Sequence, residues 1–175
     1  SNVEGTTDAY SFIPRGMIST TDSVEQKTAE QQELFDYGNR VGALIRAFEE
    51  AHVNMIPQLK DAYADRGNAA KRETAEKIGE DYQVLGKELE ALADVPASVR
   101  NMHLSIARAY QDAGKKMITK LRTTSDEEFL AEMKTYNASV LQFTNSFVAL
   151  ATYLSASGVK FSHSDAGSVF TFTSF

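Results

Sequence analysis

Apolar side chains recur every three or four residues along almost the whole stretch from about 23 to 158. This spacing places them on one face of a helix, and a helix with one apolar face must bury it against another element. The longest such stripe contains Leu34, Phe35, Gly38, Val41, Ile45, Phe48, His52, Met55, Ile56, Leu59 and Tyr63. The pattern therefore limits the chain to helices that pack against one another.

Capping and helix-breaking residues divide this stretch into four helices. The segments STTDS, Gly67-Asn68 and DVPAS, a capping box from Ser125 to Glu128, and Gly158 mark the boundaries. They predict helices over about 24–66, 69–93, 96–122 and 125–158, with a kink at Pro57 in the first. Short connections between amphipathic helices predict an all-α fold, an antiparallel up-down-up-down four-helix bundle with a long kinked first helix.

The last seventeen residues, VKFSHSDAGSVFTFTSF, follow a different pattern, because phenylalanines alternate with Ser and Thr near the end. SDAG is composed of turn-forming residues, so the sequence predicts a short C-terminal β-hairpin. The first and last helices are the longest and should project at one end of the bundle, where their apolar residues need a cover. We expect three regions: an extended N-terminal segment at 1–22, the bundle at 23–158, and a β-like ribbon at 159–175 packed on the bundle end.

The aromatic residues of the two terminal segments form a candidate interaction surface. We expect both termini to reach the projecting end of the bundle, where they could pair with each other or with a neighbouring molecule. The residues concerned are Tyr10, Phe12, Phe161, Phe170, Phe172 and Phe175.

Charge and composition narrow the class of partner. The formal net charge is −6, whereas phosphate binding needs a dense basic surface, so we expect no nucleic-acid partner. No apolar run approaches the roughly 18 residues of a membrane span, so we expect no transmembrane segment. The chain contains no cysteine, which excludes disulfides, thiol catalysis and Cys-ligated metals.

The motifs of known catalytic sites are missing or incomplete. Glu49-x-x-His52 has the helical spacing of ligands in carboxylate-bridged di-iron bundles, but those need the motif on two helices, and Arg100 stands three residues before His103. The sequence also has no nucleophile-elbow glycine motif, phosphate-cradling glycine loop or HExxH. We therefore expect no enzyme, no cofactor and no metal, with His52 as a partly buried histidine bonded to a Tyr or a carboxylate.

Three stretches, YGNRVGALI, VPASVRNMHLSIARAY and MKTYNASVLQF…GVKFSHSDAGSVF, resemble uncharacterised exported helical-bundle proteins of candidate-phylum bacteria. The resemblance covers most of residues 37–170 and includes no catalytic motif. It implies an extracytoplasmic location, in the envelope or at the cell surface, and assigns no functional residue.

Two functions remain open from the sequence. The first is a non-enzymatic, exported or cell-surface bundle that acts through protein binding or self-assembly, with the interaction surface at its terminal segments. The alternative is a small-molecule sensor or carrier that holds a ligand between its helices near His52, Tyr82 and Tyr110.

Overall fold

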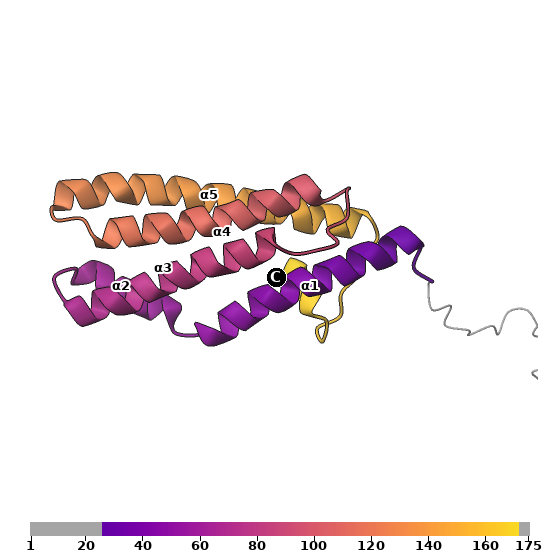
Figure 1. The fold of residues 1–175 in the computed structure, drawn as a ribbon, viewed down its shortest axis with the longest axis horizontal. Coiled ribbons are helices and arrows are strands. Elements are labelled where there is room, and N and C mark those ends of the chain that lie inside the picture. The colour runs from indigo at the N-terminus through magenta and orange to yellow at the C-terminus, as the bar shows by residue number, and fades with distance from the viewer. Residues whose placement is uncertain (1–25, 172–175) are drawn as a thin grey trace, which may run out of the picture.

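The computed structural model describes residues 26–171, and this part of the chain is all helical (Figure 1). It forms five α-helices and one short 3-10 helix. They are α1 (Ala29–Ala51), α2 (Met55–Ala64), α3 (Ala69–Glu90), α4 (Arg100–Leu121), α5 (Asp126–Ala156) and η1 (Ala166–Phe170). The prediction of an all-α chain with bundle-like packing is confirmed for these residues.

The first predicted helix is two helices, α1 and α2, rather than one kinked helix. A capping box between Thr28 and Gln31 starts α1, and the helix ends at Ala51. Residues 52–54 form turns before α2 begins, and Pro57 is the third residue of α2. Proline lacks an N–H and its ring crowds the carbonyl of Val53, four residues back, so the helix is interrupted just ahead of it.

Helices α3 and α5 each pack antiparallel to α4, which lies between them (Figure 1). The α3–α4 pair packs closely because glycines face each other across it: a Cβ on Gly114 would overlap the carbonyl oxygen of Gly79. Helix α4 begins at Arg100, four residues after Pro96, because residues 97–99 form a turn in which the Val99 N–H donates to the Pro96 carbonyl at 3.1 Å.

The N-terminus of α5 follows the predicted cap only in part. The Ser125 hydroxyl accepts a hydrogen bond from the Glu128 N–H at 3.1 Å, as expected for an N-cap. The Glu128 carboxylate instead accepts from the N–H and hydroxyl of Thr124, at 2.9 and 3.0 Å. At the other end, Gly158 has φ +80°, the left-handed conformation that stops the helix as predicted.

The predicted C-terminal β-hairpin is wrong, because the described residues contain no strand. Residues 159–171, hereafter the C-terminal segment, form a loop followed by η1. The Asp165 carboxylate accepts from the N–H and hydroxyl of Ser162, at 2.7 and 2.8 Å, and this turn leads directly into η1. Phe161 stacks on Phe35 of α1 whereas Phe170 stacks on Phe147 of α5, so the phenylalanines face two different helices.

The C-terminal segment is fixed in the space between α1 and α5 (Figure 1). The Asn39 side chain accepts from the Gly167 N–H at 2.8 Å, and Arg46 donates to the His163 carbonyl at 3.1 Å and to the Ser168 hydroxyl. Gly42 permits this approach, since a Cβ there would overlap the Ala166 carbonyl oxygen. Helices α1 and α5 make few direct contacts with each other, so the C-terminal segment fills the space between them and completes the bundle.

Two apolar clusters form the core. The larger one lies between α1, α3, α4, α5 and the C-terminal segment, and includes Leu34, Tyr37, Ile45, Leu89, Ile106, Tyr110, Leu150, Leu154 and Phe170. The smaller one joins α2 to α3 and α4 and contains Leu59, Ala62, Ala75, Ile78, Met117 and Leu121. Tyr82 packs against both clusters, so it lies at their junction.

Candidate ligand-binding site

A continuous series of aromatic rings crosses the bundle at this junction. Successive ring centroids lie 4.6 to 6.1 Å apart, within the range of favourable aromatic pairs. The series, which we call the aromatic chain, runs in the order His52, Phe48, Tyr82, Tyr110, Phe143, Phe147 and Phe170. It draws on α1, α3, α4, α5 and η1, so each main part of the fold except α2 supplies a ring.

A cavity of about 330 Å³ lies beside the aromatic chain. Its lining consists of Ile45, Phe48, Glu49, Met55, Tyr82, Tyr110, Phe143, Phe147 and Val169. The break between α1 and α2 lies next to this cavity, because Glu49 precedes it and Met55 follows it. Met55 and Tyr82 pack against the smaller core cluster and most of the other lining residues belong to the larger one or pack against it, so the cavity lies where the two clusters meet.

The polar groups of this cavity are two phenols and one carboxylate. Within residues 26–171 no hydrogen bond joins the hydroxyl of Tyr82 or Tyr110 to another side chain or to the backbone. Burial raises the pKa of Tyr82 to about 12, with smaller contributions from Tyr136 and then from the carboxylate of Glu49. Burial is also the main cause that raises the pKa of Tyr110, followed by Tyr82 and then by Glu49. Both phenols are therefore neutral near pH 7, and both lie within the electrostatic field of Glu49.

His52 lies outside this cavity. Its Nε2 is 3.2 Å from the Asp81 carboxylate, which also contacts Lys77, and its ring packs on Phe48 with centroids 4.6 Å apart. His52 lines a second hollow of about 220 Å³, which shares only Phe48 with the first. The structure thus brings Tyr82 and Tyr110 together, with ring centroids 5.8 Å apart, and separates them from the third residue of the predicted ligand cavity.

Glu49 and His52 do not converge on a common point, although they are three residues apart. Glu49 lines the aromatic cavity, whereas His52 is paired with Asp81. Within the described part of the chain no group of three or more His, Asp or Glu side chains is placed to hold a metal ion.

Two residues of the predicted interaction surface fall within the described range, and both contact the bundle. Phe170 is buried and Phe161 is half-buried against α1. Tyr10, Phe12, Phe172 and Phe175 lie outside the described residues.

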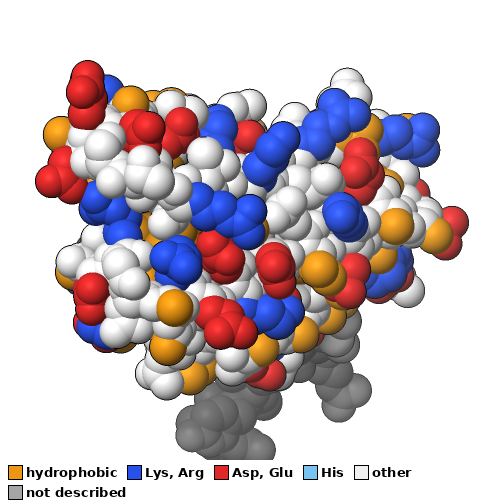
Figure 2. All heavy atoms as spheres, turned by 60° about the vertical axis from the view of Figure 1, so that its left-hand side comes forward, with side chains coloured by type: hydrophobic (Ala, Val, Ile, Leu, Met, Phe, Trp, Pro, Cys, Tyr) orange, Lys and Arg blue, Asp and Glu red, His pale blue; other side chains and the backbone are white. Residues whose placement is uncertain are grey.

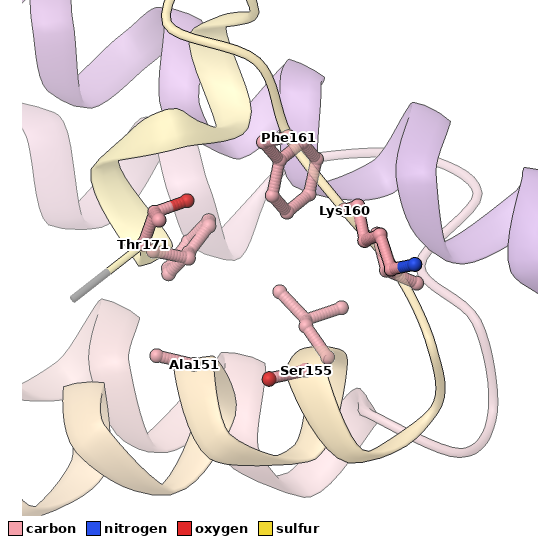
Figure 3. A pocket seen from close by; sticks show the side chains of 8 residues that line it. Ala151, Ser155, Lys160, Phe161 and Thr171 are labelled. Carbon is pink, nitrogen blue, oxygen red and sulfur yellow. The ribbon is translucent and has the colours of Figure 1, made fainter. Parts of the chain in front are cut away.

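Phe161 and Phe170 also line a hollow of about 360 Å³ between the end of α5 and the C-terminal segment (Figure 3). In Figure 3, Ala151 and Ser155 lie on α5, and Lys160, Phe161 and Thr171 lie on the segment opposite. Its edge is formed by Thr171, the last described residue. Aliphatic and small polar side chains make up most of this lining, so it offers a ligand fewer aromatic faces than the first cavity.

Sequence reasoning missed several residues of the site. Phe143 and Phe147 are four residues apart on α5 and were recognisable only as core positions, while Glu49 was considered solely as a metal ligand. Outside the site, the burial of Lys120 was also not predicted: its side chain is almost fully enclosed. Its Nζ lies 3.7 Å from the ring centroids of both Tyr63 and Tyr136. One indication of this burial was available, because Lys120 follows the buried Met117 by three residues and therefore lies on the same face of α4.

The surface and the helices add two observations about partners. On the face shown in Figure 2, Lys and Arg side chains are interspersed with Asp and Glu over most of the area. None of the helices within residues 26–171 combines the length and apolar character that a membrane span requires.

Comparison of the chain with models of known protein families gave no match, and the comparisons with curated proteins and with solved structures gave none either.

Proposed function

We propose that this protein binds a small organic molecule in the aromatic cavity between α1, α3, α4 and α5. The observation that supports the proposal most directly is the cavity's position, at the junction of the two core clusters and against five rings of the aromatic chain. Its volume of about 330 Å³ is at the lower end of the range of small-molecule sites, which are typically apolar with a few polar groups.

The two tyrosine hydroxyls support the same function. Neither hydroxyl is fully enclosed, because the buried side-chain polar atom without a partner among the described residues is the Tyr63 hydroxyl. The hydroxyls of Tyr82 and Tyr110 have no partner among the described residues, so they are available to a ligand or to water. They would orient a bound molecule, while the rings would supply apolar contact area.

Protein binding through the terminal segments stays a prediction, with less support. Phe161 and Phe170 pack within the chain and would have to leave Phe35 and Phe147 to bind a partner. The extracytoplasmic location inferred from the resemblance also stays a prediction.

The proposal is tested with 2-phenylethanol, a neutral aromatic probe, and with a variant that fills the cavity. Val169 of η1 lines the cavity and is half-buried, so Val169→Phe should occupy part of its volume. Val148→Phe is the matched control, because Val148 is 41% exposed on α5 and is not among the lining residues. Binding is followed by NMR chemical-shift changes of the tyrosine rings.

We expect saturable shifts of Tyr82 and Tyr110 in the unchanged protein and in Val148→Phe, and at least a tenfold weaker interaction in Val169→Phe. Binding that is equally strong in Val169→Phe, or no saturable binding at all, would overturn the proposed site.

A further inference from the structure

The cavity lining contains an acidic side chain but no basic one. Glu49 supplies the only carboxyl group of the lining, and no Lys, Arg or His is among the others. Glu49 is exposed, whereas every other lining residue is buried or half-buried. Within residues 26–171 no ion pair joins Glu49 to a cationic side chain, so its carboxylate is not neutralised by the described protein.

The remaining lining presents π-electron surfaces. The face of an aromatic ring is electronegative and attracts cations, most strongly where the cation is partly desolvated. This cavity contains three phenylalanine and two tyrosine rings. Phe48 and Tyr82 meet edge to face, as do Tyr110 and Phe143, with interplanar angles of 76° and 77°. Rings at such angles form several walls of a cavity rather than one flat stack.

On these two observations, and resting on the proposed function, we propose that the ligand is an organic cation: an ammonium group attached to an apolar or aromatic body. The ammonium group would lie near the Glu49 carboxylate, with the body against Phe48, Tyr110 and Phe143. The phenol oxygens of Tyr82 and Tyr110 would accept hydrogen bonds from it, since an N–H donor suits an oxygen that has no other partner.

An anionic ligand is disfavoured by the same groups. The Glu49 carboxylate lies near both tyrosine hydroxyls and contributes a little to the raised pKa values of Tyr82 and Tyr110, of which burial is the main cause. A second negative charge in this space would be repelled by Glu49 and would meet the electronegative faces of the rings.

Three probes of nearly equal shape test the charge preference: 2-phenylethylammonium, 2-phenylethanol and phenylacetate, each measured at about pH 7, where the amine is protonated and the acid ionised. Affinities are measured for the full chain by the NMR titration described above. We expect the ammonium to bind at least about threefold more tightly than the alcohol, and phenylacetate to bind most weakly.

Glu49→Gln identifies the group responsible, and Glu50→Gln is its matched control, because Glu50 is the neighbouring exposed carboxylate and does not line the cavity. Glu49→Gln should weaken the binding of the ammonium about threefold or more and change the binding of the neutral alcohol by a smaller factor. Glu50→Gln should change neither.

The outcomes separate the two proposals. If Val169→Phe abolishes binding of all three probes but the alcohol binds as tightly as the ammonium, the cavity binds ligands and the cation preference is wrong. If Glu49→Gln and Glu50→Gln weaken the binding of the ammonium equally, the preference for a cation is a general surface-charge effect and its assignment to Glu49 fails. If Val169→Phe leaves the binding of every probe intact, the cavity itself is not the site.

Discussion

The hydroxyl of Tyr37 lies 3.0 Å from Nδ1 of His103, and this contact joins α1 to α4 inside the core. Both side chains are buried. The other ring nitrogen of His103, Nε2, lies 2.7 Å from the Leu89 carbonyl oxygen of α3. Because a carbonyl can only accept, Nε2 holds the proton and Nδ1 accepts from the tyrosine hydroxyl. One neutral histidine therefore connects three helices.

Removing the hydroxyl should leave His103 Nδ1 buried without a partner. Tyr37→Phe is expected to lower the free energy of unfolding by about 1–3 kcal/mol, measured by urea denaturation at about pH 7. Tyr153→Phe is the matched control, since no hydrogen bond joins its hydroxyl to another described residue, and it should change stability little. Equal stability of the Tyr37 and Tyr153 variants would show that the contact contributes nothing net.

His103 should also make the fold sensitive to acid. Burial lowers its pKa below the ordinary 6.5, partly opposed by the hydrogen bond to Leu89. Between the lowered pKa and 6.5 the unfolded chain binds a proton that the folded chain does not, so stability is complete above pH 6.5 and falls as the pH drops below it. An NMR titration should show the His103 ring protonating at lower pH than a free histidine. Protonation at or above 6.5 would contradict this assignment.

Lys120 should produce a change in the same direction at alkaline pH, a stability that rises with pH. Burial lowers its pKa from 10.5 to about 8, and the rings of Tyr63 and Tyr136 offset part of the cost of the buried charge. Below about pH 8 that cost is fully present. Above about pH 8 the Lys120 ammonium of the folded chain loses its proton, whereas that of the unfolded chain keeps it up to about pH 10.5. Stability should therefore rise with pH until tyrosines of the unfolded chain ionise near 10.0.

The variant Lys120→Met tests the origin of this rise. It removes the charge and keeps much of the side-chain volume. At pH 7 its free energy of unfolding should therefore equal or exceed that of the unchanged protein. Its stability should no longer increase between about pH 8 and 10. Lys115→Met, an exposed position on the same helix, should retain the increase. Loss of the increase in both variants would assign it to another group.

The helices were predictable because their apolar spacing and caps are local features. Ser125 and Gly158 act within a few residues of their own position, and both were recognised from the sequence. The start of the first helix was placed after STTDS, whereas Thr28 caps α1. The break before α2 was visible as Pro57, but the sequence could not say whether the axis bends or is interrupted. That depends on how α2 packs on α3, which is a long-range contact.

The C-terminal segment and the cavity were less predictable, for the same physical reason. Phe161 and Phe170 stand next to polar residues. This pattern fits a β-ribbon and fits equally well a loop whose phenylalanine rings pack against two different helices. Only the placement of Asn39, Gly42 and Arg46 opposite the segment decides between them. Tyr82 and Tyr110 could be assigned to inward faces by their helical spacing, whereas the space beside them depends on how five helices and η1 pack together.

Gly42 should be intolerant of a side chain although it lies within a helix. Gly42→Ala would gain roughly 1 kcal/mol of helix propensity, but its Cβ would overlap the backbone of Ala166, and overpacking of this kind costs about 1–3 kcal/mol or more. We expect a lower melting temperature. Gly67→Ala is the control, because no atom lies within 4 Å of an added Cβ there, and it should melt as the unchanged protein does. A Gly42 variant as stable as the control would mean that the segment shifts at little cost.

Deletion of residues 159–175 tests the whole docking arrangement. Truncation would remove Phe161 and Phe170 and uncover Phe35, Phe147 and the face around Gly42. Burial of one large apolar side chain is worth about 1.5–3 kcal/mol, so the loss would approach the stability of a typical domain. The truncated chain should therefore melt at a much lower temperature or aggregate, as measured by circular dichroism and light scattering.

A different result would favour exchange of the segment between molecules. In that case truncation would leave the melting temperature nearly intact and abolish self-association, which sedimentation of the full chain and the truncated chain would reveal. We expect the intramolecular outcome, because the contacts of the segment are made by helices of its own chain: Asn39 accepts from the Gly167 N–H, and Gln31 donates to the Ser157 carbonyl at 3.1 Å, just where the segment leaves α5. These bonds hold both ends of the path from α5 to η1 against α1, so a short connection suffices within one molecule and a neighbour is not needed to satisfy them.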